Sequence, residues 1–239
     1  MAIDKVVGSI EEAIADIKDG ASILFGGFAG VGIPTGLVVG VKEKGVKNLT
    51  VICNDAVGAW TLPIDVSMLV ESGQIKKIIG SFMAYASPKK ITEVEKRVLE
   101  GTLELELVPQ GTLAERIRIG GAGIGGFYTP TGVGTVAEKG KEKKVLDGRE
   151  MILELPIKAD FACIKACKAD RFGNLVYHGS ARTFNPVMAA AAKVTIAEVD
   201  EIVETGSLDP DFIHTPGIYV TRIVKSAGKV GGTLKDTHQ

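Results

Sequence analysis

The chain has 239 residues, and its 28 lysines and arginines against 29 aspartates and glutamates give a formal net charge of −1. This balance argues against a protein that coats nucleic acid, because such binding needs a strong basic excess. No uncharged apolar stretch approaches the ~18 residues of a membrane-spanning helix, and the first residues do not resemble a secretory signal. We therefore expect one cytoplasmic globular domain over residues 1–239, with 228–239 as a frayed polar tail.

The N-terminal half alternates helical patterns with short apolar strands. Ser9 and Glu12 form a capping-box pattern that predicts a first helix extending to Ile17. A later helix should end at Gly45, because glycine readily adopts the left-handed backbone conformation that ends many helices. The expected strands are 21–25, 49–53, 77–80 and 103–108, and the further helices are 37–44, a stretch after Pro63, 88–99 and 113–119.

The C-terminal half continues this alternation less regularly. Strands are expected at 151–155, 160–166 and 193–199, and Asn185 and Pro186 should cap and begin a helix. We interpret the glycine-rich residues 120–134 as a functional loop, and the charged residues 138–144 as an exposed hairpin or turn. Strands that alternate with helices predict an α/β fold with an open, mostly parallel sheet.

A glycine-rich loop between an expected strand and an expected helix is the leading candidate for ligand binding. It contains Gly26, Gly27, Phe28, Ala29, Gly30, Val31 and Gly32. In parallel sheets, ligands collect at the carboxyl ends of strands. Glycines there let backbone amides approach a phosphate, pantetheine or carboxylate, and a helix N-terminus adds partial positive charge. Packing alone also explains such a turn, so both interpretations stay open.

Residues 121–126 also match the pattern G-x-G-x-x-G. They follow an expected helix instead of a strand, and no helical pattern begins after them. We therefore reject a dinucleotide site and keep a mobile, substrate-facing loop as the alternative.

Polar side chains at strand ends are the next candidates. Asn54 and Gln110 each follow an expected strand, where an amide can hydrogen-bond a carboxylate or a thioester carbonyl. From the sequence alone, the more common explanation is a turn-forming Asn and a Gln in a loop. Glu198 and Glu201 follow another strand, either as catalytic carboxylates or as the solvated start of a helix.

The cysteines and histidines give no sign of a metal site. Three cysteines are too few for a disulfide framework, and the three histidines do not complete a ligand pattern with them. Cys163 and Cys167 lie on an apolar stretch and are expected to be small buried hydrophobic residues.

Residues 19–34 resemble the first signature of the family I coenzyme A transferases, with an acidic residue and Gly, three apolar residues, Gly-Gly-Phe and then Gly-x-Pro. Further blocks look like the same family, in family order, at 108–118, 127–135, 168–175, 180–186 and 214–217. Together they cover nearly the whole chain. The resemblance is to the α (A) subunit of the short-chain acyl or 3-oxoacid CoA-transferases.

The resemblance implies an open α/β/α sheet with helices on both faces. It also implies that coenzyme A is a substrate, with no permanently bound cofactor, and that acyl-CoA and a free acid exchange CoA through a glutamyl-CoA intermediate. In this family the nucleophilic glutamate lies in a Ser-Glu-Asn-Gly type motif of the β half, which this chain lacks. We therefore assign no catalytic nucleophile here and expect a β subunit, commonly in an α2β2 heterotetramer.

By the same resemblance, residues 26–32 contact CoA or close over the active site, and Asn54, Gln110 and Gly111 line the acyl and carboxylate pocket. The alternative is a non-catalytic α/β protein that binds CoA esters. The sequence does not identify the preferred pair of acyl-CoA and acid.

Overall fold

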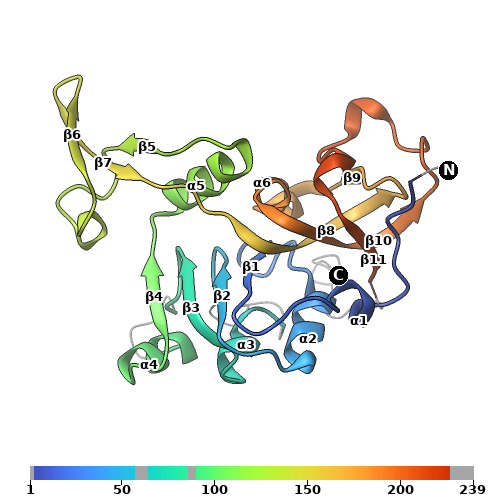
Figure 1. Ribbon diagram of the computed structural model, residues 1–239, viewed down its shortest axis with the longest axis horizontal. Coiled ribbons are helices and arrows are strands. Elements are labelled where there is room, and N and C mark those ends of the chain that lie inside the picture. Colours follow the sequence, from blue (N-terminus) through green and yellow to red (C-terminus); the bar gives the residue numbers. More distant parts are fainter. Residues whose placement is uncertain (1–2, 57–63, 86–89, 227–239) are drawn as a thin grey trace, which may run out of the picture.

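The computed structural model describes residues 3–56, 64–85 and 90–226 of the chain. Its main sheet has the strand order β11-β10-β8-β1-β2-β3-β4, and all the pairings along this path are parallel (Figure 1). The strands of this path are β1 (Ser22–Phe25), β2 (Leu49–Ile52), β3 (Ile75–Gly80), β4 (Glu104–Leu107), β8 (Ala159–Asp170), β10 (Ala192–Val203) and β11 (Arg222–Lys225). The short β9 (Leu175–Val176) pairs antiparallel with β8.

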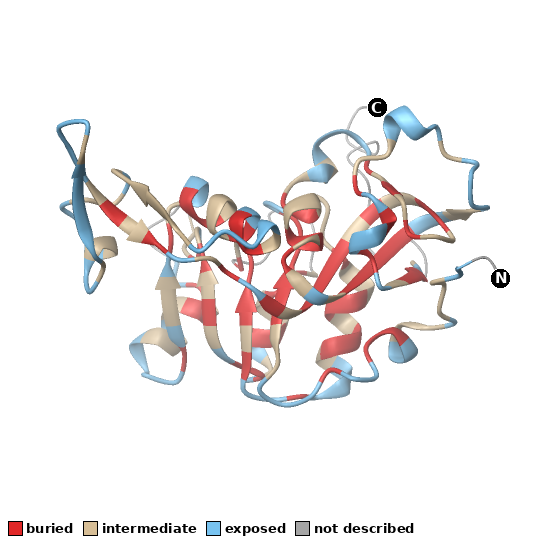
Figure 2. Ribbon diagram, turned by 45° about the horizontal axis from the view of Figure 1, so that its top comes forward, coloured by how far each residue is buried: buried red, intermediate tan, exposed pale blue. Residues whose placement is uncertain are grey.

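Helices cover both faces of this sheet, as expected. One face carries α1 (Ile10–Ala13), α2 (Thr35–Lys44), α3 (Ser67–Glu71) and α4 (Glu93–Leu99), and the other carries α5 (Gln110–Ala122) and α6 (Asn185–Ala189). Neighbouring residues of β1 show the division, because Ile23 belongs to the first core cluster and Leu24 to the second. Both side chains are fully buried, and Figure 2 shows the central strands as the most buried part of the molecule.

The ends of the first two helices follow from local chemistry. Gly45 ends α2 with φ 73° and donates its amide to the Lys42 carbonyl, as predicted. Ser9 caps α1, but the helix ends at Ala13 and not at Ile17. The Ile17 amide bonds the Ile14 carbonyl at 3.0 Å in a three-residue turn, and Lys44 Nζ donates to the carbonyl oxygens of residues 14 and 15 at 3.0 and 2.7 Å. Pro63 and residues 88–89 lie outside the described residues, as does the expected tail 228–239.

Helix α5 begins three residues before its predicted start and takes in the first part of the expected loop 120–134. Gly120 allows this extension, because a Cβ there would lie 2.0 Å from the Ile157 carbonyl oxygen. The helix ends at Gly123, which has φ 73°. The interpretation of 120–134 as one continuous loop is therefore wrong, since its first residues are helical and Phe127–Thr129 forms strand β5.

A second, smaller sheet projects from the body (Figure 1). It is antiparallel, with the order β5-β7-β6, where β6 is Lys143–Leu146 and β7 is Arg149–Glu154. The expected strand at 151–155 exists, but it belongs to this sheet and not to the parallel one. Of the two interpretations of 138–144, the turn is confirmed, since residues 139–140 form an exposed turn. The hairpin lies later in the chain and turns at Asp147 and Gly148, both with positive φ.

The C-terminal strands are longer and more numerous than the sequence predicted. β8 and β10 have 12 residues each and pair with one another along most of that length, and β11 was not predicted. Helix α6 takes Phe184 as its N-cap, so Asn185 is its first residue and not the cap. Short 3₁₀ turns complete the described chain at Val136–Glu138, Gly179–Arg182, Pro210–Phe212 and Gly217–Tyr219.

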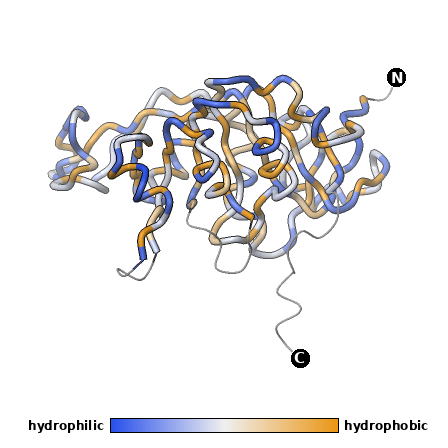
Figure 3. The backbone as a smooth tube through the Cα atoms, turned by 90° about the horizontal axis from the view of Figure 1, so that it is seen from below, coloured by the Kyte–Doolittle hydropathy of each residue, from blue (hydrophilic) through white to orange (hydrophobic). Residues whose placement is uncertain are grey.

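Hydrophobic segments run through the middle of the body, as the colours of Figure 3 show. Within the described ranges no helix has both the length and the apolar character needed to cross a membrane.

Candidate functional site

The site forms where β1, β2 and β4 end at the carboxyl edge of the main sheet. Because these strands are parallel, their following segments emerge on the same side of the molecule. The glycine loop 26–32 follows β1, Asn54 follows β2, and Gln110 begins α5 directly after β4. The sheet therefore places the glycine loop, Asn54, Gln110 and Gly111 along one edge.

The tip of the glycine loop is a tight two-residue turn. Phe28 and Val31 exchange two backbone hydrogen bonds of 2.9 Å each. Between them, Ala29 and Gly30 both have positive φ, 49° and 87°, as a turn of this kind requires. Phe28 and Ala29 are exposed, so the tip presents its backbone and one aromatic ring to the outside.

Packing against Asn185 explains the glycines at the two ends of the loop. A Cβ on Gly26 would lie 1.8 Å from Asn185 Oδ1, and one on Gly32 would lie 2.3 Å from the Ala181 carbonyl oxygen. Asn185 is fully buried; its Nδ2 donates to the Gly32 carbonyl at 3.0 Å, and its Oδ1 accepts from the Lys165 amide at 3.0 Å. One buried side chain thus holds both ends of the loop, a role that the sequence analysis missed.

A chain of hydrogen bonds connects α5 to the loop tip. Gln110 Nε2 donates to Asn54 Oδ1 at 2.8 Å, and Asn54 Nδ2 donates to Asp55 Oδ1 at 2.9 Å. The Asp55 carboxylate in turn accepts from the Ala29 amide at 3.1 and 3.2 Å. The structure therefore brings Asn54 and Gln110 together. It also adds Asp55, whose only sequence signal was an acidic residue at a strand end.

The N-terminus of α5 faces open space. Its N-cap, Pro109, has no side chain that can bond the first amides of the helix. Gln110 and Gly111 are both exposed, and a Cβ on Gly111 would meet no atom within 4 Å. The partial positive charge of this 13-residue helix is thus accessible beside Gln110.

Glu198 lies close to this edge, against the first turn of the helix that follows the glycine loop, and has a structural role there. It lies within β10, 1% exposed, and its Oε2 accepts from the Leu37 amide at 3.0 Å. Its Oε1 accepts from Ser226 Oγ, and Lys165 Nζ lies 3.7 Å away. A buried carboxylate that faces the first turn of α2 stabilises this helix, because the helix N-terminus carries a partial positive charge. The expectation that Glu198 begins a solvated helix is wrong.

Glu201 also lies within β10, where it forms an exposed ion pair of 2.8 Å with Lys168. It therefore does not begin a helix either.

The cysteines differ in their exposure. Cys53 and Cys163 are buried, and burial raises the pKa of both thiols, which keeps them protonated. Cys167 is only half-buried, contrary to expectation. Across the described segments, no group of three or more His, Cys, Asp or Glu residues is arranged to hold a metal ion.

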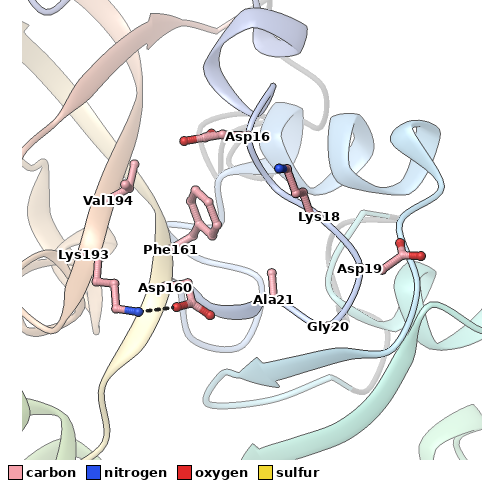
Figure 4. Close-up of a pocket in the computed structure, with 9 residues that line it drawn as sticks. All are labelled: Asp16, Lys18, Asp19, Gly20, Ala21, Asp160, Phe161, Lys193 and Val194. Carbon is pink, nitrogen blue, oxygen red and sulfur yellow. Dashed lines mark hydrogen bonds and ion pairs between the residues drawn. The ribbon is translucent and has the colours of Figure 1, made fainter.

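An open pocket of about 380 Å³ lies at the opposite, amino edge of the sheet (Figure 4). Two of its carboxylates form ion pairs within the chain: Asp160 pairs with Lys193 at 2.8 Å, and Asp16 pairs with Arg222 at 2.6 Å. Its lining is Asp16, Lys18, Asp19, Gly20, Ala21, Asp160, Phe161, Lys193 and Val194. We infer that these ion pairs stabilise the amino edge of the sheet.

Residues 7–226 match the family model described as Coenzyme A transferase. This chain belongs to the coenzyme A transferase family. It is 52% identical to the A subunit of the probable succinyl-CoA:3-ketoacid coenzyme A transferase of Bacillus subtilis, over 98% of this chain and 95% of that protein. It is 46% identical to the alpha subunit of the acetate CoA-transferase of Escherichia coli, over 91% and 96% of the two chains.

Solved structures agree on the fold of this CoA-transferase family member. Glutaconate coenzyme A-transferase from Acidaminococcus fermentans superposes with a TM-score of 0.78 at 22% identity, over 93% of this chain and 75% of that one. The acyl-CoA transferase YdiF from Escherichia coli O157:H7 gives 0.77 at 20% identity, over 93% of this chain. This chain covers 47% of YdiF, about half its length.

Proposed function

We propose that the chain is the α subunit of a CoA-transferase that moves CoA between a short-chain acyl-CoA or 3-oxoacyl-CoA and a free carboxylic acid. Its membership of the coenzyme A transferase family supports the reaction class. Relatives named as A or alpha subunits, matched over almost their full lengths, support a partner β subunit. We propose an α2β2 assembly that is active only when both kinds of chain are present.

The hydrogen bond between Gln110 and Asn54 is the observation that carries this proposal. It holds two amide side chains at the carboxyl edge of the sheet, one buried and one exposed. An amide nitrogen carries two hydrogens, so Gln110 keeps a second N–H for an oxygen of the acyl group. Asn54 fixes the orientation of that amide, which is the arrangement that oxyanion stabilisation requires.

The N-terminus of α5 supports the same role. Its uncapped amides and its partial positive charge favour an oxyanion or a carboxylate beside Gln110. Gly111 leaves the neighbouring space free of a side chain. We propose that Gln110, Gly111 and Asn54 form this chain's part of the acyl pocket, and that the loop 26–32 contacts CoA or closes over the site.

The reaction proceeds by ping-pong chemistry in this proposal. A glutamate carboxylate from the partner β chain attacks the thioester carbonyl, the C–S bond breaks, and CoA leaves as a thiolate, which leaves an acyl-glutamyl anhydride. The thiolate then attacks the glutamyl carbonyl, which releases the first acid and forms a glutamyl-CoA thioester. The second acid reverses both steps and takes the CoA. Each tetrahedral intermediate carries one oxyanion, which donors on this chain stabilise.

Exchange of labelled acetate into acetyl-CoA tests the proposal, measured side by side on the isolated chain and on the chain co-purified with a candidate β subunit. We expect activity only in the complex. Gln110→Ala should lower exchange in the complex by at least about tenfold while assembly survives, because one oriented donor to an oxyanion is lost. Unchanged exchange would remove Gln110 from the site.

The other outcomes separate the alternatives. Activity of the isolated chain would mean that it carries its own nucleophile. Acetoacetate and succinate are tested as further acids if acetate is inert. Binding of acetyl-CoA without exchange of any of these acids would favour a non-catalytic protein that binds CoA esters.

A further inference from the structure

Ser81 carries a hydroxyl group that the fold does not use. Over residues 3–56, 64–85 and 90–226, its Oγ is the one buried side-chain nitrogen or oxygen atom without a hydrogen-bond partner. A buried hydroxyl without a partner lowers the stability of a protein, so such groups are rare in folded chains. The position of Ser81 suggests what this hydroxyl is for.

Ser81 follows β3 directly and lies beside Asn54. The Ser81 amide donates to the Asn54 carbonyl at 3.0 Å, and the Phe82 amide donates to the same oxygen at 3.0 Å. A parallel bridge between Asp55 and Phe82 continues the register of β2 and β3 past their ends. Asn54 and Ser81 are therefore neighbours in the same row at the carboxyl edge.

The side chain of Ser81 lies on the same face of the sheet as α5. A Cβ on Gly80 would meet Met83 Cε at 2.1 Å, and Met83 belongs to the core cluster on the opposite face. Ile79, on the other side of Gly80, packs against the cluster that contains the α5 residues. Side chains alternate along extended chain, so Ser81 shares the face of Ile79. Gln110, at the start of α5, covers that face.

We propose that Ser81 is a substrate-contacting residue of the acyl pocket. Its hydroxyl donates a hydrogen bond to an oxygen of the acyl group that lies beside Asn54 and Gln110. This assignment rests on the proposed CoA-transferase function. Two oxygens share the required chemistry: the carboxyl oxygen that every acid has, and the additional oxygen of a 3-oxoacid or a dicarboxylic acid.

The test uses the complex of this chain with its β subunit, in which both kcat/KM and the melting temperature are measured. Ser81→Ala should lower kcat/KM for exchange by about tenfold or more, because a hydrogen bond to a charged oxygen is lost. The melting temperature should stay the same or rise, since a buried unpaired hydroxyl is removed. Ser81→Thr keeps the hydroxyl and should restore most of the activity.

Ser22→Ala is the matched control, because Ser22 Oγ donates to Asp160 Oδ2 at 2.7 Å at the other edge of the sheet. This variant should show the opposite behaviour, with a lower melting temperature and unchanged kinetics. Acetate, acetoacetate and succinate as acceptor acids distinguish the two oxygens. A loss with all three assigns the bond to the shared carboxyl oxygen, and a loss confined to acetoacetate and succinate assigns it to the additional oxygen.

The proposal is overturned if Ser81→Ala in an active complex turns over all three acids at the wild-type rate. It is also overturned if this variant melts several degrees lower, because the hydroxyl would then have a structural partner. A wild-type complex that is inactive with every acid would instead remove the proposed function, and this assignment with it.

Discussion

At the scale of single residues, two carboxylates around the glycine loop act by accepting backbone amide hydrogens. Glu198 holds the first turn of α2, and Asp55 holds the tip of the glycine loop. Neither role depends on proton transfer. Both show that an acidic residue on or after a strand need not be a nucleophile, which is consistent with the proposal that the β subunit supplies that group.

Asp55→Asn should loosen the loop tip without unfolding the chain. The asparagine keeps one acceptor oxygen and replaces the other with an amide group, so the bonds from Ala29 and from Asn54 Nδ2 can no longer all form. If the loop contacts CoA, KM for acyl-CoA should rise about fivefold or more, with a smaller change in kcat. Steady-state kinetics of the complex measure this split.

Asp19→Asn provides the control for that variant. Asp19 Oδ1 also accepts a backbone amide, from Lys47 at 2.7 Å, but it lies at the amino edge of the sheet. This variant should leave KM unchanged. Equal KM values for wild type and Asp55→Asn would show that the Asp55 contact does not order a substrate-binding loop.

At the scale of elements, the sequence predicted what local chemistry decides. The strands β1 and β2, the stop of α2 at Gly45 and the glycine loop between them follow from apolar runs and glycine positions. The length of α5 did not follow, because its extension depends on contact between Gly120 and residue 157, far along the chain. β11 was missed for the same reason, since only pairing with β10 makes that short segment a strand.

The candidate site shows the same limit. Asn54 and Gln110 were predicted individually, because each follows a strand. The two residues are 56 positions apart in the sequence, and their contact depends on the parallel order of β2, β3 and β4. Asn185 was predicted only as a helix cap, and Ser81 carried no recognisable signal, because the importance of each arises from what lies across from it in the folded chain.

The first turn of α5 provides a prediction at this scale. Gly111→Ala should stabilise the chain by about 0.5 kcal/mol, since alanine favours the helix over glycine and the new Cβ meets no atom within 4 Å. The same methyl group would enter the space beside Gln110 and should lower kcat/KM severalfold. Thermal melting and exchange kinetics on one preparation measure both effects. A variant that is more stable and fully active would place the substrate away from this turn.

At the scale of the whole molecule, the two edges of the parallel sheet do different work. The carboxyl edge carries the exposed amide of Gln110, an uncapped helix N-terminus and a turn at positive φ. The amino edge is closed by charged side chains that bind one another. We infer that the ion pairs of Asp16 and Asp160 stabilise the amino edge, whereas the carboxyl edge leaves polar groups available, which suits a binding site that a partner subunit completes.

Acid should weaken the amino edge through Asp160. Lys193, followed by the amide and hydroxyl of Ser22, lowers the pKa of Asp160 from 3.8 to about 2. A carboxylate whose pKa is lower in the folded state stabilises the fold above its unfolded pKa, and this contribution disappears as the pH falls from about 4 to about 2. The carboxylate binds Ser22 of β1 and Lys193 of β10, so its protonation loosens two strands of the sheet at once.

Asp160→Asn should therefore lower the free energy of unfolding by about 1 kcal/mol at pH 6, a value reduced for solvent screening because the Asp160 side chain is 39% exposed. The difference from wild type should shrink at pH 4 and again at pH 3, since the wild type progressively loses the same charge. Urea unfolding at the three pH values measures it, and Asp147→Asn at the exposed β6–β7 turn, away from the amino edge, is the control for the substitution itself. A difference that stays constant from pH 6 to pH 3 would show that the charge of Asp160 does not stabilise the amino edge.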